Sequence, residues 1–171
     1  MMPLPPQGDP GVVGKIRLRD ARMEDTEVIH RMLKALAEHI GDGEKFVSTA
    51  EDVRRDCFGP RPFYEAIMAE LDGAVAGLAV FFTTYSTFNG RPCLFVDSLY
   101  VEPAARGSDL GRRLMARVCA RAVARGCCRV DLHVLHANAA RGFYESIGMR
   151  ATDERPYEIT GRALQALASL G

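Results

Sequence analysis

Two turn dipeptides, Asp72-Gly73 and Asn89-Gly90, constrain the fold more than any other feature of this sequence. They separate three runs rich in apolar, β-branched and aromatic residues, which cover 63–70, 74–85 and 92–101. Asp-Gly and Asn-Gly readily adopt the positive φ angles that two-residue hairpins require. The sequence therefore predicts a three-stranded antiparallel meander.

Helix and strand patterns on both sides of the meander predict an α/β fold with a mixed, mainly antiparallel sheet flanked by helices. Apolar residues recur at helical spacing from Ile29 to Ile40, and Thr49-Ala-Glu-Asp is typical of a second helix start. The helix at 110–125 stops at Gly126 and is followed by an alternating run, which with the last meander strand predicts a β-α-β unit. The remaining predicted elements are a strand at 16–19, a strand at 129–134, a short helix at 143–147, a strand at 157–159 and a helix at 161–170.

Length and composition predict one globular domain over 15–171, preceded by a disordered leader at 1–14 that is rich in Pro and Gly. Lys+Arg and Asp+Glu are both 22, so no overall field favours nucleic acid or an anionic membrane. The longest uncharged apolar stretch, 74–85, is too short to span a bilayer, and the N-terminus does not read as a signal peptide. A cytoplasmic location is therefore expected.

Five cysteines, an odd number without a C-x-x-C pair, predict reduced structural thiols rather than a disulfide framework or zinc site. His133 and His136 form H-x-x-H, but such side chains on a strand point to opposite faces, so no metal site is expected. Arginines recur every fourth residue from Arg113 to Arg125, without interleaved aromatic residues. This pattern is more typical of a solvated helix face than of a nucleic-acid stripe.

A glycine-containing turn joins the strand ending at Val101 to the helix beginning near Leu110. Free N–H groups and the positive dipole end of a helix can bind a pyrophosphate there, and Arg106 and Arg112 add positive charge. An ordinary strand-to-helix turn is the alternative interpretation.

Two segments resemble the signatures of GNAT acetyltransferases. Val101-Glu102-Pro103-x-x-Arg106-Gly107-x-x-x-Gly111 is similar to the pyrophosphate-binding motif of that family. Gly142-Phe143-Tyr144-Glu145-x-x-Gly148-Met149 is similar to its second signature, and the two occur in the family's order. Residues 31–64, the strand containing Phe81 to Tyr85 and the region from Tyr157 to Ala168 resemble the spermidine/spermine branch, which includes enzymes acting on thialysine.

The resemblance implies a GNAT fold in which the strands 92–101 and 129–134 splay apart and admit acetyl-CoA as cosubstrate, without a metal. It implies that Tyr144 is the general acid for the departing thiolate and that Asp97 binds and helps to deprotonate an amine. It further implies a pocket for a small-molecule amine and a homodimer formed through the C-terminal strand and helix. The implied acceptor-pocket residues are Asp97, His39, Asp131 and His133, and the implied cofactor-binding residues are Leu99, Tyr100, Val101, Arg106, Gly107, Ser108, Asp109, Leu110, Gly111, Arg112, Asn138 and Arg141.

Three features depart from the family pattern. Asp109 stands where the middle glycine of the pyrophosphate motif is expected, and Asn138 lies six residues before Tyr144, whereas the family position is seven before it, at Ala137. Acidic residues that grip long polyamines are displaced or absent in the loop 38–44 and after Tyr85, which favours a shorter acceptor. The alignment of Asp97 with the family is ambiguous by one residue, because aligning the strand from the hairpin instead of from Val101 matches Asp97 to the following acidic residue of the family.

The chemistry of acetyl transfer fits these residue types. An alkylammonium group has a pKa of about 10.4 and must lose a proton before it attacks a thioester, so a nearby carboxylate is expected. A tyrosine can protonate the leaving thiolate, whose aqueous pKa is about 8.5, and direct transfer in a ternary complex is expected. Two alternatives stay open: acetylation of a protein N-terminus or lysine, and a catalytically silent acyl-CoA-binding sensor.

Overall fold

The computed structural model describes residues 14–135 and 138–171, which form two compact units that divide between Asn138 and Ala139. The predicted leader at 1–14 falls, except for Gly14, outside the described residues, as do His136 and Ala137. The single-domain assignment of residues 15–171 stays a prediction.

The first unit contains a five-stranded sheet in the order β1-β2-β3-β4-β5. Neighbours from β1 to β4 pair antiparallel, and β4 and β5 pair parallel. The meander is therefore formed as predicted, with Asp72 (φ 52°) and Gly73 (φ 86°) both left-handed in the first hairpin. The strands are β1 (Ile16–Asp20), β2 (Glu65–Leu71), β3 (Ala74–Ser86), β4 (Arg91–Val101) and β5 (Val130–Leu132).

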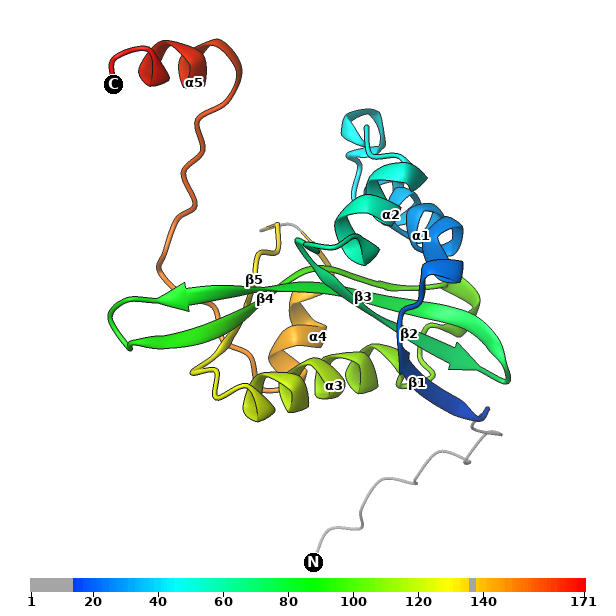
Figure 1. The fold of residues 1–171 in the computed structure, drawn as a ribbon. Helices are drawn as coiled ribbons and strands as arrows, with labels where there is room; N and C mark the ends of the chain where they lie inside the picture. The colour runs from blue at the N-terminus through cyan, green and yellow to red at the C-terminus, as the bar shows by residue number, and fades with distance from the viewer. Residues whose placement is uncertain (1–13, 136–137) are drawn as a thin grey trace, which may run out of the picture. The chain divides into compact units, whose positions relative to one another are not determined.

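Helices cover both faces of this sheet (Figure 1). The α-helices of the first unit are α1 (Thr26–His39), α2 (Ala50–Phe58) and α3 (Leu110–Ala124), with 3₁₀ turns η1 (Met23–Asp25), η2 (Gly43–Lys45) and η3 (Pro103–Ala105). Side chains alternate along a strand, so Leu78 and Val80 share one face of β3 and pack with Ile29 and Met32 of α1. Gly77 faces the other way, toward Leu114 of α3.

The core between α1, α2 and the sheet consists of fully buried apolar side chains. Ile29, Met32, Val53, Met68 and Leu78 each have 0% exposure. Burying one such side chain stabilises a fold by about 1.5–3 kcal/mol. The predicted start of α2 is confirmed, because the Thr49 hydroxyl and the Asp52 carboxylate cap each other's backbone N–H.

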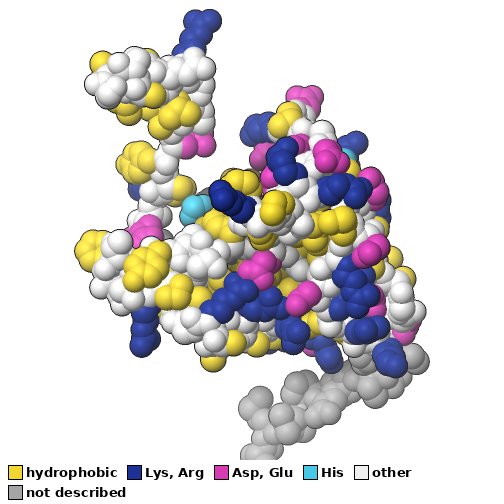
Figure 2. All heavy atoms as spheres, viewed as in Figure 1, with side chains coloured by type: hydrophobic (Ala, Val, Ile, Leu, Met, Phe, Trp, Pro, Cys, Tyr) yellow, Lys and Arg dark blue, Asp and Glu magenta, His cyan; other side chains and the backbone are white. Residues whose placement is uncertain are grey.

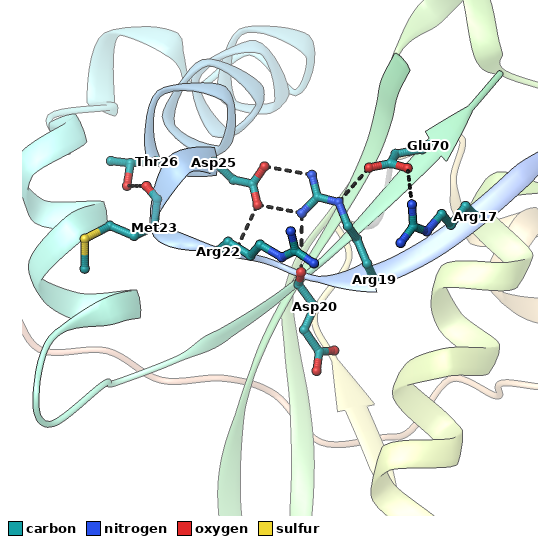
Figure 3. A network of polar contacts seen from close by, with 8 residues as sticks. All are labelled: Arg17, Arg19, Asp20, Arg22, Met23, Asp25, Thr26 and Glu70. Atoms are coloured by element: carbon teal, nitrogen blue, oxygen red, sulfur yellow. Dashed lines mark hydrogen bonds and ion pairs between the residues drawn. The ribbon is translucent and has the colours of Figure 1, made fainter. Parts of the chain in front are cut away.

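A polar network joins β1, β2 and the start of α1 (Figure 3). The Arg19 guanidinium donates to Asp25 at 2.7 and 2.8 Å and to Glu70 at 2.6 Å. Asp25 also accepts the backbone N–H of Arg22 at 2.7 Å. The Arg19 hydrogen bonds hold the pKa of Asp25 below its ordinary range. This network fixes the N-terminal end of α1 against the sheet edge.

Two arginines at the C-terminal end of α3, Arg121 and Arg125, have carboxylate partners within the first unit. Arg121 contacts Asp20 at 2.6 Å and Glu65 at 2.9 Å, and Arg125 contacts Glu65 at 2.6 Å. Figure 2 shows that Lys and Arg are interspersed with Asp and Glu on the visible face. These ion pairs agree with a solvated, charge-compensated helix face.

The second unit contains two short helices, α4 (Arg141–Ser146) and α5 (Gly161–Ala168). The strand predicted at 157–159 is absent, so that prediction is wrong for the isolated chain. Tyr157 is 94% exposed, and a strand forms only where a neighbouring edge satisfies its backbone groups. No helix in the described part of the chain is long and apolar enough to cross a membrane.

Candidate functional site

Strands β4 and β5 pair over a short stretch only, which fits the splayed pair that the family resemblance implies. They pair over three positions, Leu94 with Val130, Phe95 with Asp131 and Val96 with Leu132. Strand β4 then continues to Val101, while β5 ends at Leu132. Residues 97–101, which include the predicted cofactor-binding Leu99, Tyr100 and Val101, therefore have no partner strand on the β5 side among the described residues. We call the two strands and this unpaired edge the β4–β5 fork.

Asp97 lies at a β-bulge where the fork opens. Strand β3 pairs Phe81 with Val96 and Val80 with Ser98, so Asp97 has no partner across the ladder. The bulge explains the one-residue ambiguity seen in the sequence, since counts from the two ends of β4 differ by the extra residue. Asp97 is exposed, and its Oδ2 accepts a hydrogen bond from the Ser98 hydroxyl at 3.0 Å. The fold thus presents this carboxylate to solvent at the fork.

Tyr64 is a neighbour of Asp97 that the sequence analysis did not assign to the site. Burial raises the pKa of Tyr64 to about 12, and the negative charges of Asp56, Asp52 and Asp97 act in the same direction. The phenol is therefore held in its neutral form, as a hydrogen-bond donor. Its place directly before β2, within the segment resembling the spermidine/spermine branch, was the available signal.

Aromatic rings line the face of the sheet that carries α1 and α2, next to the fork. Phe82 lies 5.3 Å from Phe95 between ring centroids, and Phe95 lies 4.9 Å from His133 in an edge-on contact. The predicted pocket residue His133 is thus packed against an aromatic wall. Its neighbour Asp131 is already paired with Arg129 at 2.8 Å, which leaves Asp97 as the less compensated carboxylate.

Among the described residues, no hydrogen bond, ion pair or ring contact joins His39 to this group. It is the last residue of α1 and is exposed. Within the described chain, it has no hydrogen bond or ion pair to Asp97, Asp131 or His133. Its predicted substrate role stays a prediction.

The turn before α3 has the geometry of an anion site. Gly107 (φ 84°) and Asp109 (φ 69°) both adopt left-handed backbone conformations. In the described residues, no hydrogen bond engages the N–H groups of Gly107, Asp109, Leu110, Gly111 and Arg112. These N–H groups and the α3 dipole suit a pyrophosphate. Ser108 instead bonds backward, through its N–H and hydroxyl, to the Ala105 carbonyl.

The Asp109 carboxylate is exposed and lies between two guanidinium groups. Arg112 Nε is 3.4 Å from it and Arg113 Nε is 3.5 Å from it. Asp tolerates a left-handed backbone better than most residues, so Asp109 can stand where the family motif has its middle glycine. The two ion pairs compensate the negative charge of the carboxylate, but they also engage Arg112, which is one of the predicted cofactor-binding residues.

Glu102 connects the fork to this turn and to α1. It accepts the Tyr100 hydroxyl at 3.1 Å and pairs with Arg31 at 3.0 Å, while its N–H donates to Ala76 at 2.9 Å. Arg106 Nε donates to the Val101 carbonyl at 3.2 Å. The side chain of Tyr100 is buried, so that only its backbone is available to a ligand. Sequence reasoning missed Arg31 and Glu102, because their contact joins positions far apart in the chain.

Tyr144 and Arg141 belong to the second unit, on α4. The Tyr144 ring makes an edge contact with Phe143 at 5.2 Å, and burial raises the pKa of its phenol. Arg141 lies 3.9 Å from Glu145, one turn further along the helix. Asn138 ends the first unit, with its N–H donating to Leu135 at 2.9 Å. The meeting of these residues with the fork stays a prediction.

Metal-ligand types are not clustered here. Among the described residues, no group of three or more His, Cys, Asp or Glu could hold a metal ion.

Comparison with known proteins places this chain in a family. The profile of the acetyltransferase (GNAT) family matches residues 27–149, which include the meander, the α3 turn and α4. The chain belongs to this family and is an acyl-transferring enzyme. Members of the family use acetyl-CoA as cosubstrate.

Two curated relatives and one solved structure show the same likeness. The chain is 29% identical to a thialysine N-epsilon-acetyltransferase of Bos taurus, over 90% of this chain and 97% of the relative. It is 30% identical to the enzyme of that name from Mus musculus, over 89% and 96%. An integron cassette protein of V. cholerae has the same fold, with a TM-score of 0.74 at 21% identity, over 90% and 97%. The predicted family, branch and fold class are therefore confirmed.

Proposed function

We propose that this enzyme transfers the acetyl group of acetyl-CoA to the terminal primary amine of a small molecule of the thialysine, lysine or short polyamine type. The observation that carries the proposal is an exposed carboxylate, Asp97, at the opening of the β4–β5 fork. The names of the relatives support an amine acceptor, and the likeness to them extends over nearly the whole chain.

The cosubstrate's parts fit the described groups. The unengaged N–H groups of Gly107 and of residues 109–112 suit a pyrophosphate, and the free edge of residues 97–101 suits an extended pantetheine amide chain, which adds to β4 like a strand. The aromatic wall of Phe82, Phe95 and His133 suits the methylene chain of an amine.

We assign charge attraction and proton transfer to two residues, Asp97 and Tyr144. An ammonium group near Asp97 is attracted electrostatically, and the carboxylate accepts its proton, directly or through water. The free amine then attacks the thioester carbonyl and forms a C–N bond as the C–S bond breaks. The departing thiolate takes a proton from Tyr144, whose raised pKa keeps the phenol protonated at neutral pH.

The test is acetyl transfer from acetyl-CoA to a panel of amines: thialysine, lysine, spermidine and a peptide with a free N-terminus. Turnover of the small amines supports the proposal. Turnover of the peptide alone would assign a protein substrate, and CoA binding without any turnover would assign a sensor.

Asp97→Asn identifies the ammonium partner. This variant should raise the KM for the amine at least about tenfold, the effect of losing one charge-assisted hydrogen bond, with little change in CoA affinity. Asp131→Asn is the matched control, since Arg129 already compensates that carboxylate on the paired strand. A larger effect of Asp131→Asn would move the ammonium site to β5.

We also propose a homodimer formed through the second unit, as the resemblance implies. Every residue from Arg150 to Gly171 is exposed in the isolated chain. The large apolar side chains of α5 and its end, Leu164, Leu167 and Leu170, are 50%, 59% and 82% exposed, and hydrophobic side chains are visible over α5 in Figure 2. Light scattering should give twice the chain mass, and Leu164→Asp with Leu167→Asp should give a monomer. A native monomer would refute this assignment.

A further inference from the structure

Two cysteine sulfurs meet at the closed end of the fork. Cys93 Sγ on β4 lies 3.3 Å from Cys128 Sγ, which precedes β5. Backbone hydrogen bonds hold the two segments on both sides of this contact. Cys128 N–H donates to Pro92 at 2.9 Å, and Leu94 N–H donates to Arg129 at 3.1 Å. The sulfurs are therefore kept in contact by the sheet itself rather than by flexible side chains.

The two thiols differ in exposure. Cys93 has 0% exposure, whereas Cys128 is exposed. Burial raises the pKa of the Cys93 thiol, and the positive charge of Arg129 acts against this rise. A small oxidant in solution thus reaches Cys128 first, and Cys93 is the adjacent thiol that the oxidant does not reach. This is the arrangement of a reactive thiol and a resolving thiol.

We propose that Cys93 and Cys128 form a redox-sensitive dithiol, which a hydroperoxide converts to an intramolecular disulfide. In the first step, the Cys128 sulfur attacks the peroxide, the O–O bond breaks, and sulfenic acid forms with release of water or an alcohol. In the second step, the Cys93 sulfur attacks Cys128, the S–O bond breaks, and the hydroxyl leaves as water with the Cys93 proton. Two electrons pass from the thiols to the peroxide.

The other cysteines are less suited to this reaction. Among the described residues, Cys93 and Cys128 are the one cysteine pair joined by a sulfur hydrogen bond. Cys57 lies on α2 and Cys119 on α3. Cys127 adjoins Cys128, but its N–H closes the end of α3 by donating to Ala122 at 2.9 Å. A bond between neighbouring cysteines would distort that turn.

The disulfide has a structural consequence that does not depend on the acyl-transfer reaction. It would join β4 to the start of β5 directly below the three paired positions and would close a loop that contains α3. Closing a loop of this kind removes conformations from the unfolded chain. The oxidised protein is therefore expected to melt about 4–16 °C higher than the reduced protein.

The experiment treats the reduced full-length protein with hydrogen peroxide and counts free thiols before and after. The expected result is the loss of two thiols per chain, no gain of oxygen mass, and recovery with dithiothreitol. Non-reducing gels should show a monomeric chain. Intermolecular dimers, or stable sulfinic acid on Cys128, would overturn the proposal.

Cysteine variants identify the two sulfurs that form the disulfide. Trypsin leaves Cys127 and Cys128 together on the peptide 126–129, so Cys127→Ser is the essential control and should still form the disulfide. Cys128→Ser changes an exposed position and should not form the disulfide. Cys93→Ala removes the buried partner and should not form it either. Cys57→Ser and Cys119→Ser should behave as the native chain. A Cys128→Ser protein that still loses two thiols, or a Cys127→Ser protein that loses none, would refute the pair.

Discussion

Replacement of Asp109 with Asn should tighten CoA binding while lowering the stability of the fold. Asp109 is the N-cap of α3, and its carboxylate holds Arg112 and Arg113 at 3.4 and 3.5 Å. Before these guanidinium groups can reach a pyrophosphate, they must leave the carboxylate. Asn keeps the size of the side chain and the tolerance of the left-handed φ of 69°, but it releases both arginines.

The magnitude follows from the two ion pairs. The three side chains are about half exposed, at 49%, 54% and 51%, so each pair is discounted for solvent to about 0.2–1 kcal/mol. Two pairs give roughly 0.4–2 kcal/mol, which corresponds to a Kd for CoA about 2- to 30-fold lower in Asp109→Asn. The gain should disappear at high salt, because the Debye length falls to about 3 Å at 1 M.

Stability should move in the opposite direction. A negative charge at a helix N-terminus contributes about 0.3–1 kcal/mol and the two ion pairs add roughly 0.4–2 kcal/mol, so Asp109→Asn should melt at about 1–12 °C below the native chain. The assay is isothermal titration with CoA at low and high salt, together with melting curves without ligand. Asp109→Gly serves as a second variant, since it removes the same charge and suits the backbone equally well. Equal or weaker CoA binding in both variants would show that Asp109 does not compete with the cosubstrate.

Three further perturbations test other parts of the structure. Tyr144→Phe should lower kcat by about 10²–10⁴-fold with little change in the Kd for CoA, and a near-native kcat would exclude Tyr144 as the general acid. Native activity should fall as the pH rises through the pKa of Tyr144, which burial raises above its usual value of about 10. Asp25→Asn should cost about 1.5–3 kcal/mol at neutral pH by denaturant unfolding. Because the folded pKa of Asp25 is depressed, this difference should be lost as the pH falls below about 4, and a difference that persists in acid would contradict the Arg19 pairing. Gly77→Ala should destabilise by about 1–3 kcal/mol, since the added Cβ would lie 3.1 Å from Leu114 Cδ1 and 3.3 Å from the Tyr100 carbonyl; an unchanged midpoint would show that α3 can shift.

Features set by local chemistry were predictable from the sequence. Asp72-Gly73 requires only its own backbone preferences to form a two-residue hairpin, and the Thr49 capping box requires only Asp52. The second hairpin also forms, but its loop spans residues 87–90, and of Asn89 and Gly90 it is Gly90 that has a positive φ, 59°. Local preference also sets the left-handed turn at Gly107, where the sequence predicts pyrophosphate binding. Here the residue type and the conformation are linked within a few positions of the chain.

Features that depend on distant partners were not predictable in the same way. The pairing of Glu102 with Arg31 and the effect of Asp97 on Tyr64 arise only when separate elements pack together. The strand expected at 157–159 has an alternating pattern, but it has no neighbouring edge in the isolated chain. Pattern alone identified a sequence able to form a strand and could not supply its partner.

The bulge in β4 places one extra residue in a strand that otherwise pairs regularly with β3. Val96 pairs with Phe81 and Ser98 pairs with Val80, so the bulge takes up the extra residue without turning either half of β4 over. Asp97 itself contributes no side chain to the core and no pair to the ladder. Substitution of Asp97 should therefore cost the fold little, and deletion of the residue would leave a regular ladder in which Val96 and Ser98 keep their present faces and partners. What the extra residue adds to β4 is an exposed carboxylate, which can change without any change in the core.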